Sequence, residues 1–198
     1  MNRLFLLLLS GILIFSCQRG EEDPFISFKS RKMRLTGDWK VDRAEMVEGD
    51  TSWLIANGEM VRSVNGDESP AIPYTQNISF QNDGVYRINV TIEFPDDYDF
   101  IGQLGYTFSQ EQTGIWQFSG GNGEAKSKSL LVFLPDKIQE STFIGGALDV
   151  TAYEGQNEAN VYDIVKLTSS ETKLRYDKLI KDDLGSYRSS ASYTLVKR

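Results

Sequence analysis

The chain of 198 residues contains no histidine and only one cysteine, and these two shortages exclude most common catalytic designs. Without histidine there is no Ser-His-Asp triad, no Cys-His pair and no imidazole ligand for a metal. A single cysteine forms no internal disulfide and no cysteine-based zinc cluster. Histidine and cysteine are the side chains that most often supply general bases and nucleophiles near neutral pH. We therefore expect a protein that is not an enzyme and that needs no metal and no cofactor.

The balance of charge excludes a second class of function. The sequence has 28 acidic and 21 basic side chains, which gives a net charge of −7. A surface that binds nucleic acid needs clustered lysine and arginine, so we expect no nucleic-acid partner. Hydrophobic residues make up 40% of the chain and charged residues 25%, which is ordinary for a globular protein. The length fits a single domain.

The N-terminus has the layout of an export signal. Arg3 supplies a positive charge, and residues 4–15 form an apolar stretch of 12 residues. A bilayer span needs about 20 apolar residues. The stretch therefore fits a signal peptide, residues 1–16, better than the alternatives of a short membrane anchor or a buried core helix.

The single cysteine, Cys17, follows a small residue, Ser16, at the end of the apolar stretch. This arrangement resembles the lipobox of bacterial lipoproteins, although Ile14 and Phe15 depart from its usual residues. The resemblance implies cleavage before Cys17, a diacylglycerol on its sulfur and a third acyl chain on its amine. Each buried CH₂ of such chains contributes about 0.8 kcal/mol to membrane binding. Gln18 follows where an inner-membrane lipoprotein has aspartate, which implies the outer membrane, on its periplasmic or its cell-surface side.

Residues 17–34 are predicted to hold the lipidated cysteine, an acidic tether and a short basic helix. The tether, residues 18–23, is either a plain solvated linker or an acidic export signal of the type seen in Bacteroidetes lipoproteins. The best helix pattern covers residues 27–35. Its basic side chains are Lys29, Arg31, Lys32 and Arg34. These side chains either meet anionic head groups or phosphates at the membrane, or form the solvated face of the helix.

Beyond residue 35 the sequence changes to short runs of alternating polar and apolar residues, which predict half-buried strands. The clearest run is residues 85–94, where every second side chain from Tyr86 to Phe94 is apolar or aromatic. The Asn-Asp-Gly sequence at 82–84 predicts a hairpin turn, because asparagine and glycine tolerate positive φ. The eight predicted strands are residues 39–47, 76–80, 85–94, 104–118 (bulged near Gly114), 129–134, 161–168, 173–180 and 189–197. Eight antiparallel strands in chain order predict an up-and-down barrel over residues 35–198, preceded by the short helix.

Five segments of this region resemble one known family. Gly37-Asp38-Trp39 resembles the Gly-x-Trp motif that opens the first strand of lipocalins. The segments FQNDGVY (80–86), GIWQF (114–118), YDIVKLTSSETKLRY (162–176) and YTLVK (193–197) are similar to lipocalin-like lipoproteins of Bacteroidetes. The resemblance covers residues 31–198 and implies an eight-stranded lipocalin-like barrel. It also implies that Trp39 packs at the closed end under a basic side chain of the last strand, Lys197 or Arg198.

The connections between the predicted strands are long at one rim and short at the other. Residues 48–75 and 135–160 are the longest, and both lie at the rim opposite the entry of the chain into the barrel. Long loops at one rim commonly carry function, so we predict a ligand-binding mouth there, facing away from the membrane. The predicted ligand-binding residues are Trp53, Tyr98, Phe100 and Phe143. The alternative is that these side chains pack beneath their own loops.

Two functions follow from these predictions. The first is a lipid-anchored outer-membrane lipoprotein whose lipocalin-like barrel binds a small hydrophobic or amphipathic ligand at the membrane-distal mouth. The alternative is a non-enzymatic structural or interaction lipoprotein whose long loops dock another envelope protein. An eight-stranded barrel has room either for packed side chains or for one small ligand, so a hollow interior favours the first function. Asp96, Asp97 and Asp99 lack the spacing of a calcium loop, and we expect them to form a solvated acidic loop.

Overall fold

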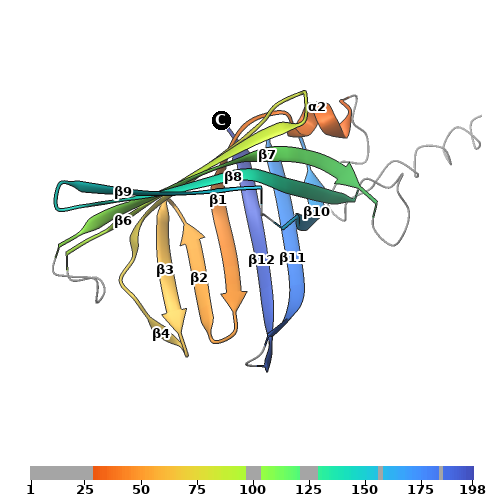
Figure 1. Cartoon of the computed structure of the whole chain (residues 1–198). Coiled ribbons are helices and arrows are strands. Elements are labelled where there is room, and N and C mark those ends of the chain that lie inside the picture. The colour runs from red at the N-terminus through yellow and green to blue at the C-terminus, as the bar shows by residue number, and fades with distance from the viewer. Residues whose placement is uncertain (1–28, 97–103, 121–128, 156–157, 183–184) are drawn as a thin grey trace, which may run out of the picture.

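The computed structural model describes residues 29–96, 104–120, 129–155, 158–182 and 185–198 (Figure 1). Cys17 and the predicted signal peptide lie outside these ranges. Within them the chain forms the helix α2 (Arg31–Leu35) and an all-antiparallel set of strands. The strands are β1 (Gly37–Glu48), β2 (Thr51–Ala56), β3 (Glu59–Val64), β4 (Asp67–Glu68), β5 (Ile72–Phe80), β6 (Val85–Phe94), β7 (Tyr106–Ser119), β8 (Leu130–Ile144), β9 (Ala147–Glu154), β10 (Asn160–Leu167), β11 (Glu171–Asp182) and β12 (Gly185–Lys197). In the same ranges no helix has the length and apolar character that a membrane span requires.

The strands form one sheet that closes on itself. Ten strands make the closed ring, in the order β1-β2-β3-β5-β6-β7-β8-β10-β11-β12, and β12 pairs back onto β1. In the described parts of the chain, β4 pairs only with β3 and β9 only with β8, so these two strands lie outside the ring. The predicted all-β antiparallel barrel is therefore confirmed, but its ring has ten strands rather than the eight predicted.

Two hairpins replace the long loops that the sequence predicted. Residues 48–75 contain β2 and β3, and the turn between these strands is Asn57-Gly58, with φ of 56° and 81°. Residues 135–160 contain β9 and most of β8, joined at Gly145-Gly146 with φ of 55° and 87°. Positive φ at two successive residues gives the tight turns that connect antiparallel strands. The prediction of long loops at this rim is therefore wrong. Most of these residues pair as strands of the sheet instead.

The β2–β3 hairpin widens only one end of the barrel. At the start of β1, residues 37–40 pair directly with residues 77–80 of β5. Further along, residues 43–48 of β1 pair with β2 instead. The ring is therefore narrower near α2, which we call the narrow end, and broader at the opposite, wide end. In Figure 1 strands β6–β9 diverge from strands β1–β3, β11 and β12 with distance from α2.

The clearest predicted strand and its turn are confirmed. β6 begins and ends at the predicted residues, and its side chains from Tyr86 to Phe94 pack on the core at every second position. The turn before it contains Gly84, which has a φ of 97°. The alternation therefore predicted both the length of this strand and the face that it buries.

A bulge interrupts the pairing of β7 with β8, as the glycine in the middle of β7 predicted. The register shifts between Thr113 and Gly114, and Gly114 lies opposite Pro135. A Cβ atom on Gly114 would overlap the carbonyl oxygen of Leu134 and would lie 2.9 Å from Cε1 of Tyr86. Only glycine allows the two backbones to approach this closely.

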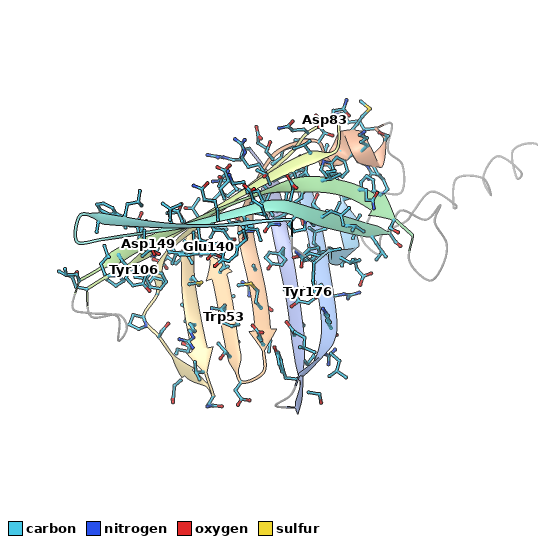
Figure 2. All side chains as sticks on the ribbon, in the orientation of Figure 1. Trp53, Asp83, Tyr106, Glu140, Asp149 and Tyr176 are labelled. Carbon is cyan, nitrogen blue, oxygen red and sulfur yellow. The ribbon has the colours of Figure 1, made fainter. Side chains whose placement is uncertain are left out.

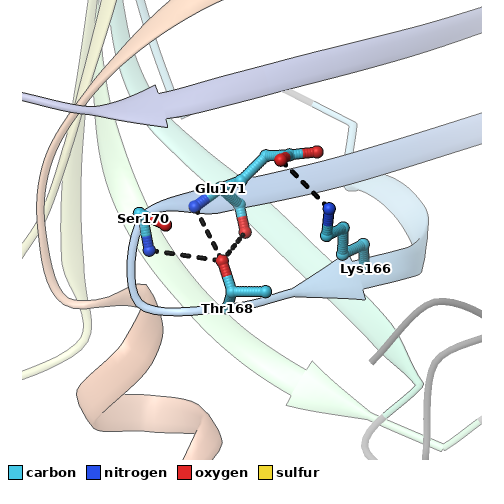
Figure 3. A network of polar contacts seen from close by, with 4 residues as sticks. All are labelled: Lys166, Thr168, Ser170 and Glu171. Carbon is cyan, nitrogen blue, oxygen red and sulfur yellow. Dashed lines mark hydrogen bonds and ion pairs between the residues drawn. The ribbon is translucent and has the colours of Figure 1, made fainter. Parts of the chain in front are cut away.

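A small polar network fixes the turn between β10 and β11 (Figure 3). The Thr168 hydroxyl accepts hydrogen bonds from the backbone N–H groups of Glu171, at 2.8 Å, and Ser170, at 3.2 Å. It donates to the carbonyl oxygen of Glu171 at 2.9 Å, and Lys166 Nζ lies 3.0 Å from the Glu171 carboxylate. A hydroxyl that satisfies several backbone groups in this way favours a tight turn, which holds the two strands in register.

Side chains fill the narrow end. Those that are at most 1% exposed include Leu35, Trp39, Phe80, Tyr86, Leu131 and Leu195. The Phe80 ring packs edge-on against Trp116, with 5.6 Å between ring centroids. Tyr86 packs in the same way against Phe133, at 4.8 Å. The narrow half of the barrel is thus a packed aromatic core.

Trp39 joins the helix to the first and last strands. Its side chain is fully buried, and its indole N–H donates to the carbonyl oxygen of Leu35 at 2.6 Å. Lys197, its partner across β1 and β12, places Nζ 5.0 Å from the indole ring centroid. The same ammonium donates to the carbonyl oxygen of Thr36 at 2.7 Å. Desolvation in this position lowers the pKa of Lys197.

The basic residues of α2 do not all face outward. Arg31 and Arg34 are only 7% and 8% exposed. The Arg31 guanidinium lies 5.9 Å from the ring centroid of Phe118, and Arg34 donates a hydrogen bond to the carbonyl oxygen of Leu167. Both alternatives offered by the sequence, a membrane-facing cluster and a solvated helix face, are therefore wrong for these two arginines. They are held by the barrel instead, because α2 covers its narrow end.

Candidate ligand-binding cavity

The barrel is hollow at its wide end. Between the diverging strands lies a space of about 770 Å³, which we call the outer cavity. Its walls are formed by Met46, Trp53, Met60, Arg62, Val64, Asp67, Glu68, Ser69, Tyr74, Gln76, Val90, Ile92, Phe94, Tyr106, Gln110 and Tyr193. Figure 2 shows Trp53 and Tyr106 on the two separate layers of strands that enclose this space. Its volume lies within the range of small-molecule sites, about 300–1,000 Å³.

The alternation of side chains along the strands determines the chemistry of the walls. Every second residue of β6 points inward, which brings Val90, Ile92 and Phe94 to the cavity. In the neighbouring strand β7, Gln110 lies opposite Val90 and Tyr106 lies opposite Phe94. The rings of Phe94 and Tyr106 stack with 4.3 Å between their centroids. The β6 side of the cavity is therefore apolar and aromatic, and β7 adds polar groups beside it.

A smaller space of about 120 Å³, which we call the inner chamber, continues the outer cavity toward the narrow end. The two spaces share Gln76, Val90, Gln110 and Tyr193. The inner chamber is also lined by Ile78, Ile88, Gln112, Phe133, Asn160, Tyr162, Leu174 and Leu195. Phe133 belongs to the aromatic core, so the chamber is the floor of the hollow half of the barrel.

Two glutamines of β7 make hydrogen bonds beside the inner chamber. The Gln110 amide donates to a carboxylate oxygen of Glu140 in β8 at 2.9 Å. The Gln112 amide donates to the hydroxyl of Tyr86 at 2.6 Å. These bonds fix the orientation of both amides, since each side chain has one anchored end.

Tyrosines supply further polar groups of the interior. Tyr162 makes edge-on contacts with Tyr176 and Tyr193, with 5.8 and 5.9 Å between ring centroids. Burial raises the pKa of Tyr74, Tyr162 and Tyr193 far above the ordinary tyrosine value of 10.0. Their hydroxyls are therefore neutral throughout the physiological pH range and can both donate and accept hydrogen bonds.

The charged groups of the outer cavity lie at its rim. Arg62 of β3 is opposite Trp53 of β2, and its side chain is exposed. Asp67 and Glu68 of β4 line the same rim. Among the lining residues, two acidic side chains and one basic side chain are thus at the mouth, whereas the deeper walls are uncharged.

The structure distributes the predicted ligand-binding residues over different places. Trp53 lines the outer cavity. Tyr98 and Phe100 lie outside the described residues. Phe143 is 51% exposed and lies opposite Leu148 in the β8–β9 hairpin, on the other face of the sheet from Glu140. It lines a separate surface hollow beside β6 and β7 rather than the interior.

Most of the cavity residues were missed at the sequence level. Tyr74 lies at the end of a segment predicted as a loop, and Gln76 and Gln110 are polar residues at inward-facing strand positions. A count of every second residue backward from the buried Trp116 would have placed Gln112 and Gln110 in the interior. A polar side chain at such a position is a sign of a functional interior, because a packed core disfavours it.

The structure describes only part of the acidic segment that was compared with a calcium-binding loop. Asp96 accepts a hydrogen bond from the backbone N–H of Gly105 at 2.5 Å. Asp97 and Asp99 lie outside the described residues. In the part of the chain that the structure describes, no group of three or more acidic, histidine or cysteine side chains is arranged to hold a metal ion.

The arrangement is suited to holding a small molecule. An apolar body can pack against the aromatic and aliphatic walls, and a few amides and hydroxyls can fix one polar end. No protein-family model, curated protein or solved structure matches the chain.

Proposed function

We propose that this chain is a lipid-anchored outer-membrane lipoprotein, resembling the lipocalin-like lipoproteins of Bacteroidetes, whose barrel binds a small hydrophobic or amphipathic molecule. The observation that carries the proposal is the outer cavity of about 770 Å³ in the wide half of the barrel. A barrel filled with side chains along its whole length would have opposed it. Instead, two connected spaces lie inside the barrel beyond Phe133.

The position of α2 supports a membrane-distal mouth. α2 lies at the narrow end, beside Trp39, and the cavity opens at the wide end. The 12 residues from 17 to 28 can span at most about 40 Å when extended. Acyl chains on Cys17 would therefore hold the narrow end toward the membrane, and the mouth would face away from it.

A side chain that fills the cavity should abolish ligand binding. Val90 lines both the outer cavity and the inner chamber, so Val90→Trp would occupy the space where they meet. We expect the affinity of the full-length chain for the neutral fluorescent probe Nile red to fall at least about tenfold, because a blocked pocket loses most of its contact area. Fluorescence titration measures the change.

Val85→Trp is the matched control, because Val85 lies on the same strand with its side chain exposed at 37%. This variant should bind the probe as the unmodified chain does, and far-UV circular dichroism should show both variants folded. Equal binding by Val90→Trp and the unmodified chain would place the ligand elsewhere and contradict the proposal.

Replacement of Cys17 should remove the membrane anchor. Cells that express Cys17→Ala are expected to lose incorporation of labelled palmitate into this protein, since the acyl chains have no sulfur to attach to. The protein should then leave the membrane fraction after cell disruption. Ser27→Ala, which leaves the lipobox intact, serves as the control and should keep its label. Unchanged labelling of Cys17→Ala would refute the lipoprotein assignment.

A further inference from the structure

The inner chamber differs from the outer cavity in its polar groups. Six of its lining residues carry uncharged polar side chains, and none of the twelve is charged. The six are Gln76, Gln110, Gln112, Asn160, Tyr162 and Tyr193. The deepest part of the hollow is therefore polar and uncharged, whereas the space above it combines apolar side chains with the charged groups of the rim.

Several of these groups have hydrogen-bond donors or acceptors that no described residue uses. Gln110 uses one amide hydrogen on Glu140, and within the described residues its carbonyl oxygen has no partner. Gln76 accepts from the Tyr74 hydroxyl at 2.7 Å, which leaves its amide hydrogens for another acceptor. The Tyr162 hydroxyl likewise makes no hydrogen bond to a described residue, although its ring is held by its neighbours. Together these groups offer both donors and acceptors to a guest.

A negatively charged head group does not fit this floor. A carboxylate that left water for the inner chamber would meet no cation, and Glu140 lies just behind Gln110. An ion buried without a counter-charge is strongly disfavoured, whereas a hydroxyl or an amide that recovers its hydrogen bonds is not. The basic group of the outer cavity, Arg62, is at the rim and shares it with two acidic side chains.

We propose, on the basis of the binding function above, that the ligand is a neutral amphiphile that binds with its polar end innermost. An uncharged hydrogen-bonding head, such as an alcohol or an amide, occupies the inner chamber. The apolar body lies in the outer cavity against Met46, Trp53 and Ile92, and its far end points to the mouth. The site thereby selects neutral molecules over fatty acids of the same chain length.

Three probes with the same alkyl chain test this selectivity: dodecanol, dodecanoate and dodecylammonium. Each competes with Nile red on the full-length chain at neutral pH. We expect dodecanol to bind at least about tenfold more tightly than dodecanoate, because its head keeps its hydrogen bonds without burying an unpaired charge. Below the pKa of the ligand's own carboxyl group, dodecanoic acid should approach the affinity of dodecanol.

Gln110→Leu should weaken dodecanol binding about fivefold, the effect of one lost hydrogen bond. Gln117→Leu is the matched control, because Gln117 lies on the same strand with its side chain exposed. It should leave the affinity for dodecanol unchanged. Equal losses in the two variants would argue against a head group in the inner chamber.

The remaining outcomes separate this inference from the proposed function. Equal or tighter binding of dodecanoate or dodecylammonium overturns the inference while the cavity remains a binding site. If Arg62→Gln then removes the binding of dodecanoate, the ligand lies with its head at the rim. Nile red binding that no probe displaces also overturns the inference. A failure to bind Nile red at all contradicts the proposed function, and the inference falls with it.

Discussion

Gly114→Ala is expected to destabilise the barrel by about 3 kcal/mol, a large share of the 5–15 kcal/mol that typically stabilises a domain. The added methyl group would overlap the carbonyl oxygen of Leu134, and the ring of Tyr86 lies 2.9 Å away on another side. Neither neighbour can move freely, since one is backbone and the other is fully buried. Overpacking of this kind displaces backbone and strains rotamers, and it does so where β7 and β8 change register.

Urea denaturation followed by tryptophan fluorescence measures this loss, and Gly155→Ala is the matched control. A Cβ atom on Gly155 meets nothing within 4 Å, but the residue has a φ of 70°. Its replacement should therefore cost only about 1 kcal/mol of backbone strain. If Gly114→Ala were no more destabilising than this control, the result would contradict the close approach of the β7 and β8 backbones at the bulge.

Trp39→Ala should cost about 4 kcal/mol of unfolding free energy, because it removes the largest fully buried side chain of the narrow end. It leaves a cavity between α2 and the core, and the Leu35 carbonyl oxygen loses its 2.6 Å hydrogen bond. The Lys197 ammonium also loses the ring that it faces at 5.0 Å. We expect the closure of the barrel by its first and last strands to weaken most.

Trp53→Ala is the control for this second substitution, because Trp53 is only partly buried and faces the hollow end. It should cost about 1 kcal/mol, since removal of a side chain beside an existing cavity creates little new empty space. Thermal unfolding followed by circular dichroism should give a clearly lower melting temperature for Trp39→Ala than for Trp53→Ala. Equal melting temperatures would show that the narrow end is not the packed core of the molecule.

The sequence predicted the bounds of its clearest strand better than it predicted how many strands the barrel has. Alternation places β6 at its observed bounds because one face of that strand packs on the core and the other is solvated. The β2–β3 hairpin was missed although Asn57-Gly58 and Asn65-Gly66 are both strong turn signals with positive φ. Its strands alternate less clearly, since β2 has no polar residue between Trp53 and Ala56: Ile55 packs in the core and Trp53 lines the cavity.

Phe143 was assigned to the mouth because residues 135–160 were predicted to form a loop at that rim, and the bulge that makes Gly114 sensitive decides which face of β8 it takes. Counted by twos from the buried Phe133, Phe143 falls on the inner face of β8. The extra residue Asp136 at the bulge reverses this order, because Pro135 pairs with Gly114 and the next pair is Lys137 with Thr113. All later side chains of β8 change face, so Glu140 turns inward and Phe143 outward. A single inserted residue leaves no mark in the alternation that a sequence alone could reveal.

A short seam in the ring, between β8 and β10, has a consequence for how long a ligand would stay bound. β7 pairs with β8 along nearly its whole length, but β10 pairs with β8 only over residues 160–163 and 130–133. Tyr162 belongs to this short seam and also lines the inner chamber. Segments with few backbone pairs open locally at a lower free energy than the rest of a sheet. For a ligand bound as proposed, opening of the seam would expose its head group to water, so its dissociation rate would depend on fluctuation of β10 as well as on the shape of the mouth.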